Sequence, residues 1–258
     1  MNTEVKVAFD RVAQELYFKD VGLELAQRPK MRSGLFSVSE PKRVGSSSGD
    51  IIGDGVVVYE ETLSAQQRQD AGDSLLFAEM RADAVCNKNR KDREKWYAEY
   101  DRALLNCGFR LKDLTFTDFK SKETKLTVNK AILQILQTIA GPNPAKIMNM
   151  MSIAFGTLKE DEEGLKLIER KSSENNGGTF KGVPCILDGG ELTVLMACLD
   201  LKSKNTLVNG FWGEYNAEEL KIYRAAGARV INQDAFGYVR DRVRGYIYGS
   251  QDDYFKNL

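Results

Sequence analysis

Histidine is absent from the 258-residue chain, and its absence excludes a large group of catalytic and metal-binding arrangements. Serine and cysteine nucleophiles that depend on an imidazole are excluded, as are zinc and iron sites with histidine ligands. A zinc site made only of cysteines needs closely spaced pairs, and the four cysteines (Cys86, Cys107, Cys185 and Cys198) form no C-x-x-C pair. An ordinary pH switch near neutrality is also lost. The chemistry that stays open uses carboxylates, lysine, tyrosine or hard metal ions.

Phosphate loops, membrane spans and a secretion signal are missing as well. The segment 45–55 is rich in glycine and serine but contains neither G-x-x-x-x-G-K-[ST] nor G-x-G-x-x-G. No apolar run approaches the ~20 residues that cross a bilayer. The residues Met1 to Lys6 lack the basic and apolar parts of a Sec signal peptide. The default localisation is therefore the cytoplasm; specialised secretion, which leaves no such mark, is the alternative.

Neither sign of charge is in excess, because 37 Lys and Arg residues balance 37 Asp and Glu residues. Nucleic-acid binders usually carry a basic excess, so no nucleic-acid partner is expected. The chain is 42% hydrophobic and has 12 Phe and 10 Tyr, which is enough apolar material for a packed core. The cysteines are expected to be buried thiols, because a chain of this length does not need covalent staples.

Helical spacing dominates the first 160 residues. It predicts a helix from Val5 to about Gln27, with Val12 and Leu16 on its apolar stripe. An irregular segment from Leu35 to about Val58 follows and ends in the short β-like run Val56 to Tyr59. Three further elements are predicted: a helix after Ser64, which forms a capping box with Gln67; a helix with Trp96, Tyr100, Leu104 and Cys107, closed by Gly108; and a strand from Phe109 to Phe116 whose alternation slips at Lys112-Asp113.

Two apolar helices joined by Gly141-Pro142-Asn143-Pro144 form a predicted helical hairpin over residues 128–158. Thr127 and Asn143 are the expected N-caps, and Pro144 suits the first turn of the second helix. That helix carries Met148, Met151 and Phe155 on its apolar side. This side is either the core of the helical layer or a deformable surface for an acyl chain, a membrane or a partner helix, a use that suits methionine.

Turns and strands replace the helical pattern after residue 160. Leu165 to Ile168 alternates loosely, and Asp188-Gly189-Gly190 between two apolar runs predicts a β-hairpin. Three more elements follow: a strand from about Thr206 to Tyr215, a hairpin around Ala226-Gly227, and a helix capped by Asp234. The predicted fold class is α+β, with a helical layer that includes the helical hairpin (1–160), then an antiparallel sheet of hairpins and a C-terminal helix (161–258).

Charged clusters offer two other candidate sites. Paired carboxylates can act as general acid and base or bind Mg²⁺ or Ca²⁺, and basic segments can bind an anionic lipid or nucleic-acid surface. For both, an ordinary solvated surface is the simpler interpretation. The carboxylates are Asp50, Asp54, Glu60 and Glu61; the basic residues are Lys88, Arg90, Lys91, Arg93 and Lys95, and then Arg240, Arg242 and Arg244.

The predicted function is a non-enzymatic binding or effector protein, toxin-like or virulence-like, that engages a lipid, a membrane surface or a partner protein through apolar surfaces. No metal or cofactor is expected, and a fatty-acyl group is the one ligand considered. The alternatives are a carboxylate-dependent or metal-assisted hydrolase and an assembly component. The predicted binding residues are Met148, Met151, Phe155, Phe211 and Trp212.

Overall fold

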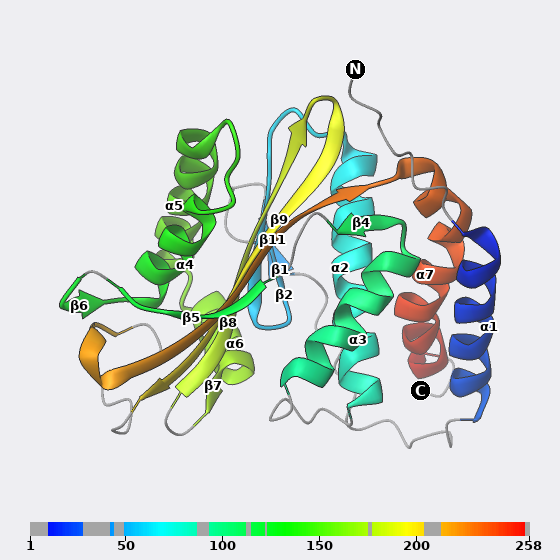
Figure 1. The fold of residues 1–258 in the computed structure, drawn as a ribbon. Helices are drawn as coiled ribbons and strands as arrows, with labels where there is room; N and C mark the ends of the chain where they lie inside the picture. The colour runs from blue at the N-terminus through cyan, green and yellow to red at the C-terminus, as the bar shows by residue number, and fades with distance from the viewer. Residues whose placement is uncertain are drawn as a thin grey trace. The chain divides into compact units, whose positions relative to one another are not determined.

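The computed structural model of the chain describes residues 10–27, 42–43, 49–86, 93–111, 115–121, 123–174, 177–203 and 213–255 (Figure 1). The helices are α1 (Arg11–Gln27), α2 (Ala65–Val85), α3 (Arg93–Asn106), α4 (Val128–Gln137), α5 (Pro144–Glu160), α6 (Glu162–Ser172), α7 (Gln233–Phe255) and the 3-10 turn η1 (Ala217–Glu219). The strands are β1 (Lys42–Arg43), β2 (Gly49–Ile52), β3 (Gly55–Tyr59), β4 (Phe109–Leu111), β5 (Thr115–Phe119), β6 (Lys125–Leu126), β7 (Ser173–Glu174), β8 (Gly177–Asp188), β9 (Glu191–Ser203), β10 (Tyr215–Asn216) and β11 (Leu220–Ile231). The predicted α+β class is confirmed.

The chain forms two compact units, each assembled from separate stretches of sequence. Helix α2 begins in unit 2 and ends in unit 1. Unit 1 comprises Met1–Ser39, Asp73–Phe109 and Asn232–Leu258, and unit 2 comprises Glu40–Gly72 and Arg110–Ile231.

Unit 2 contains a mixed sheet. Among the described residues, its nine strands follow the order β1-β2-β3-β8-β9-β11-β4, with β5 also paired to β11 and β7 to β8. Strands β3 and β8 are parallel, whereas β1–β2, β2–β3, β7–β8, β8–β9, β9–β11 and β5–β11 are antiparallel. The strands predicted for residues 161–258, β8, β9 and β11, form antiparallel pairs with one another, and the parallel neighbour β3 comes from the first part of the chain.

The predicted hairpin at Asp188-Gly189-Gly190 is confirmed. Asp188 pairs with Glu191, and the two intervening glycines have φ angles of 61° and 86°. Positive φ at both central residues is what a tight two-residue β-hairpin requires and what glycine permits. The second predicted hairpin is wrong: Ala226 and Gly227 lie inside the continuous strand β11, because β9 supplies a pairing partner along almost its whole length.

Helices α4 and α5 form the predicted helical hairpin and pack on the sheet. The Thr127 hydroxyl accepts a hydrogen bond from the Lys130 amide at 3.3 Å, so the predicted cap of α4 is confirmed. Pro144 occupies the first turn of α5, but the Asn143 side chain makes no capping hydrogen bond. At Gly182 of β8, a Cβ atom would overlap the side chain of Ile132 of α4, so the helix approaches the sheet where a side chain is missing.

Three local predictions need correction. The loosely alternating segment from Leu165 to Ile168 lies in α6. At the start of this helix, the Asp161 carboxylate accepts a hydrogen bond from the Gly164 amide at 3.0 Å. Part of the predicted irregular segment is β2, paired with β3 around the Gly53-Asp54 turn. Helix α7 is capped by Asn232, whose side chain accepts from the Ala235 amide, so Asp234 lies in its first turn. Most of the predicted strand from Thr206 to Tyr215 lies outside the described residues.

Unit 1 is helical, and Figure 1 shows α1 beside α7. An aromatic series crosses its interior: Phe18 of α1 stacks on Phe77 of α2 at 5.5 Å between ring centroids, and Phe77 meets Tyr246 of α7 edge-on at 5.1 Å. The capping box of Ser64 and Gln67 at the start of α2 is confirmed by reciprocal hydrogen bonds of 3.2 and 2.9 Å. The predicted periodic residues of α3 are buried, and so are Phe236, Val239 and Val243 of α7, so each helix turns its apolar stripe inward.

Candidate binding surface on α1 and α7

Helix α1 carries apolar side chains on two different sides. Tyr17, Phe18 and Val21 are buried. Val12 and Leu16, the residues of the predicted stripe, are 69% and 57% exposed. Because they are four residues apart, they lie on one face of the helix. The stripe that sequence spacing predicts is thus the outward face, and the packing of unit 1 uses the neighbouring face.

Three cations surround these exposed residues. Arg11 and Lys19 of α1 and Arg242 of α7 line the same hollow as Val12 and Leu16, and its volume is about 570 Å³. Glu15 and Phe18 complete the lining. The lining therefore combines three positive charges, one negative charge and apolar side chains. We call Arg11, Val12, Leu16, Lys19 and Arg242 the α1–α7 surface.

Tyr238 of α7 fixes part of this surface. The guanidinium carbons of Arg11 and Arg242 lie 5.7 and 5.6 Å from the centre of its ring, within the range of cation–π attraction. Its hydroxyl donates to the carboxylate of Glu15, and this hydrogen bond raises the pKa of Tyr238. A guanidinium nitrogen of Arg242 also lies 3.8 Å from a carboxylate oxygen of Glu15. In the described part of the chain, Arg11 and Lys19 have no carboxylate partner.

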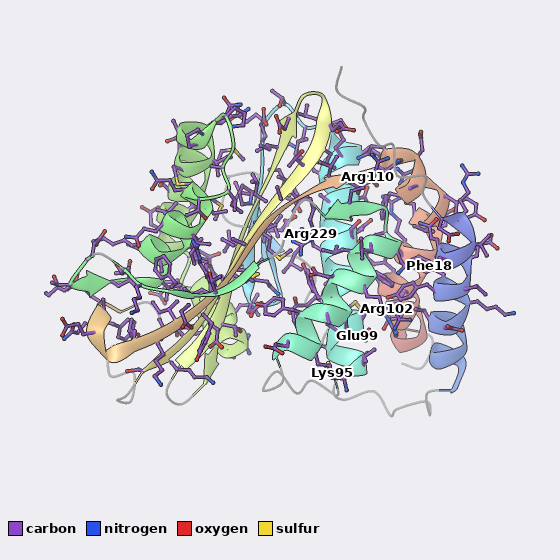
Figure 2. The ribbon with its side chains drawn as sticks, in the orientation of Figure 1. Phe18, Lys95, Glu99, Arg102, Arg110 and Arg229 are labelled. Atoms are coloured by element: carbon purple, nitrogen blue, oxygen red, sulfur yellow. The ribbon has the colours of Figure 1, made fainter. Side chains whose placement is uncertain are left out.

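The buried side of α1 is positioned by polar contacts as well. The Gln14 amide donates to the backbone carbonyl of Asn106 at 2.8 Å. Arg102, labelled with Phe18 in Figure 2, lies 5.4 Å from the centre of the Tyr17 ring. Burial raises the pKa of Tyr17 to about 12, although Arg81 and Arg102 oppose the shift. This phenol therefore stays protonated at neutral pH.

The predicted binding residues lie elsewhere. Met151 and Phe155 are buried in the core between α5 and the sheet, and Met148 is half-buried against it. The structure thus brings these three side chains together on the inner face of α5. Phe211 and Trp212 lie outside the described residues. A ligand role for the five stays a prediction; for Met151 and Phe155 it would require the helical hairpin to separate from the sheet.

Two of the four candidate carboxylates, Asp54 and Glu60, are buried, and each forms an ion pair with a lysine. Asp54 lies in the turn between β2 and β3, 2.6 Å from the Lys181 ammonium group, and both side chains are only 2% exposed. The Thr179 hydroxyl donates to the same carboxylate. The pair joins the β2–β3 turn to β8. A buried pair of this kind adds little net stability, because the cost of desolvating both charges offsets much of their attraction.

Glu60, the second, joins α5 to the sheet. Its carboxylate accepts hydrogen bonds from the Lys146 ammonium group, the Thr62 hydroxyl and, at 3.0 Å, the Leu187 amide. Burial raises the pKa of Glu60, but these three hydrogen bonds together lower it further, so the pKa lies below its usual value.

The other two candidate carboxylates are Asp50 and Glu61. Asp50 accepts a hydrogen bond from the Tyr59 hydroxyl at 2.9 Å, and Glu61 is exposed. Among the side-chain partners of the candidate carboxylates are Tyr59 for Asp50, Lys181 and Thr179 for Asp54, and Lys146 and Thr62 for Glu60. Within the described ranges, no group of three or more Cys, Asp or Glu side chains is arranged to hold a metal ion.

The three arginines of α7 have different environments. Arg244 binds the Asp73 carboxylate at 2.8 Å, and Arg240 lies 5.5 Å from the centre of the Phe236 ring. Only Arg242 belongs to the α1–α7 surface. In the other predicted basic segment, residues 88–91 lie outside the described parts of the chain.

The four cysteines are buried and form no disulfide, as predicted. Burial raises the pKa of Cys107 and Cys185 above the usual value of a thiol. In the β8–β9 register Cys185 pairs with Val194, and Cys198 pairs with Lys181, so the two thiols are not opposed.

Comparison with known proteins does not assign the chain to a family. No family model matches, and no curated protein matches. A solved structure described as that of the Evf virulence factor is similar over 94% of this chain and 90% of its own, with 13% sequence identity and a TM-score of 0.37. A likeness this weak decides neither the fold nor the function of the chain.

The sequence pattern identified the stripe of Val12 and Leu16 but not its exposure. The signal that could have shown it is the charge pattern of α1. Arg11, Glu15 and Lys19 recur every four residues directly beside Val12 and Leu16, and a helical face edged by charges is usually solvated. The contribution of Arg242 depends on tertiary packing and leaves no local trace.

Proposed function

We propose that the chain is a non-enzymatic, effector-type protein that attaches to a membrane surface through the α1–α7 surface. The observation that carries the proposal is the exposure of Val12 and Leu16, at 69% and 57%, beside the three cations Arg11, Lys19 and Arg242. An apolar face edged by cations is typical of helices that lie in the interface between lipid headgroups and acyl chains.

The energetic reason for attachment is the transfer of two apolar side chains from water. Full burial of one valine or leucine side chain is worth about 1.5–3 kcal/mol. Attachment would be interfacial, since within the described residues no helix is long and apolar enough to cross a bilayer. The protein in the similar solved structure is a virulence factor, but a likeness this weak adds no support.

Vesicle co-sedimentation tests the proposal. Wild-type chain is mixed with phosphatidylcholine–phosphatidylserine vesicles and compared with the double variant Val12→Gln/Leu16→Gln. The matched control is Ile153→Gln, which changes a residue of α5 that is 54% exposed. We expect the double variant to bind at least about 10-fold more weakly, because it loses the apolar transfer energy, and the control to bind as the wild type does. Equal binding by the double variant and the wild type, or no binding by the wild type, would overturn the proposal.

A further inference from the structure

We infer that the α1–α7 surface selects anionic phospholipid headgroups over zwitterionic ones. This inference rests on the proposed membrane attachment and specifies the lipid class. Two observations support this selectivity: which charged groups line the hollow, and which contacts each of these groups already makes.

The cations come from two helices and converge on one hollow. Arg11 and Lys19 lie on α1, Arg242 lies on α7, and all three line the hollow of about 570 Å³. Arg11 and Arg242 are held near the same aromatic ring, that of Tyr238. A planar guanidinium group can donate two parallel hydrogen bonds to a phosphate or carboxylate, whereas lysine acts as a point charge. The set is therefore suited to the phosphate and carboxylate of an anionic headgroup.

The acids of this region are already engaged or lie outside the hollow. Glu15, the one acid in the lining, accepts from the Tyr238 hydroxyl and lies near Arg242. Asp10 accepts hydrogen bonds from the amides of Val12 and Ala13, both at 3.0 Å, at the start of α1. Asp20 is exposed but does not line the hollow. The lining therefore keeps an excess of two positive charges on a chain whose total charge is zero.

The neighbouring apolar residues favour a bilayer over a dissolved anion. Val12 and Leu16 lie between the cations along α1, and a free phosphate ion offers nothing to bury them. At a bilayer surface the two side chains meet the acyl boundary, while long basic side chains extend to the headgroup phosphates. Apolar and cationic groups on one face thus fit a single occupant, an anionic lipid surface.

Binding to vesicles of two compositions tests the inference. Full-length chain is titrated with phosphatidylcholine vesicles and with phosphatidylcholine–phosphatidylserine vesicles. The triple variant Arg11→Gln/Lys19→Gln/Arg242→Gln is compared with the control triple variant Lys120→Gln/Lys159→Gln/Arg170→Gln. The control removes the same total charge from exposed positions of unit 2. Circular dichroism checks that each variant is folded.

The wild type is expected to prefer the anionic vesicles. A basic residue near an anionic surface contributes about 1 kcal/mol, so the first triple variant should lose about 100-fold in affinity for them. The control should stay within about 3-fold of the wild type, because its three residues do not line the hollow. Raising the salt concentration should weaken binding of the wild type to the anionic vesicles more than it weakens binding of the first triple variant.

Different outcomes separate this inference from the proposed function. If the wild type binds both vesicle types equally, headgroup selection is overturned while membrane attachment stands. If both triple variants lose affinity equally, overall charge and not this surface selects the lipid, and the inference is also overturned. If the wild type binds neither vesicle type, the proposed function itself fails.

Discussion

Helices α1 and α5 both carry apolar side chains, but the two helices use them in opposite ways. On α5, Met151 and Phe155 are buried between the helix and the sheet of unit 2. On α1, Val12 and Leu16 are exposed beside three cations, and a different face of the helix packs into unit 1. Apolar content therefore does not by itself separate a core face from an exposed face, and it is the exposed face of α1 for which membrane attachment is proposed.

The strongest test of this comparison is truncation of one apolar residue on each helix. Phe155→Ala should lower the free energy of unfolding by about 3–5 kcal/mol, because it opens a cavity between α5 and the sheet. Leu16→Ala should change it by no more than about 0.5 kcal/mol, because its side chain is already largely in water. Urea unfolding followed by circular dichroism measures both. A large loss for Leu16→Ala would mean that α1 is packed like α5.

The close approach of α4 to β8 gives a second test. Gly182→Ala adds a methyl group that would overlap Ile132, so the helical hairpin must shift, and we expect a loss of about 1–3 kcal/mol. Gly156→Ala on α5 is the matched control, since nothing lies within 4 Å of its added methyl group. Alanine favours a helix over glycine, so the control should gain up to about 1 kcal/mol. Equal effects in urea unfolding would contradict the packing described for α4.

The Glu60–Lys146 contact gives a smaller, pH-dependent test of how α5 is attached. Glu60→Gln should lower the free energy of unfolding at pH 7 by about 1–2 kcal/mol, because a charged acceptor of three hydrogen bonds is lost. The pKa of Glu60 is lower in the folded chain than its ordinary value of 4.5. The stabilisation by the carboxylate is therefore complete above the unfolded pKa and is lost as the pH falls through the folded one.

The measurement is urea unfolding of the wild type and of Glu60→Gln at several pH values between neutral and acid. The gap between them should close as the pH falls below 4.5. Glu61→Gln, a change at an exposed neighbour, should show no such gap. A gap that does not depend on pH would mean that the charge of Glu60 does not help to hold α5.

Local signals in the sequence predicted local structure correctly. The capping box at Ser64 and the cap at Thr127 depend on residues three positions apart, and the Gly189-Gly190 turn depends on backbone freedom at two residues. The error at Ala226-Gly227 arose because the continuity of β11 is set by its pairing with β9, far away in sequence. Part of the α1–α7 surface was missed for the same reason: Arg242 joins Arg11 and Lys19 only through the packing of α7, far away in sequence.

Unit 1 has its first helix near one end of the chain and its last near the other, and unit 2 occupies most of the sequence between them. During synthesis the ribosome must therefore release α7 before Arg242 can join Arg11 and Lys19. A chain that stops before α7 contains all the described strands of the sheet but lacks Arg242, so it cannot assemble the hollow. The proposed attachment through both helices therefore becomes possible only after α7 has been made.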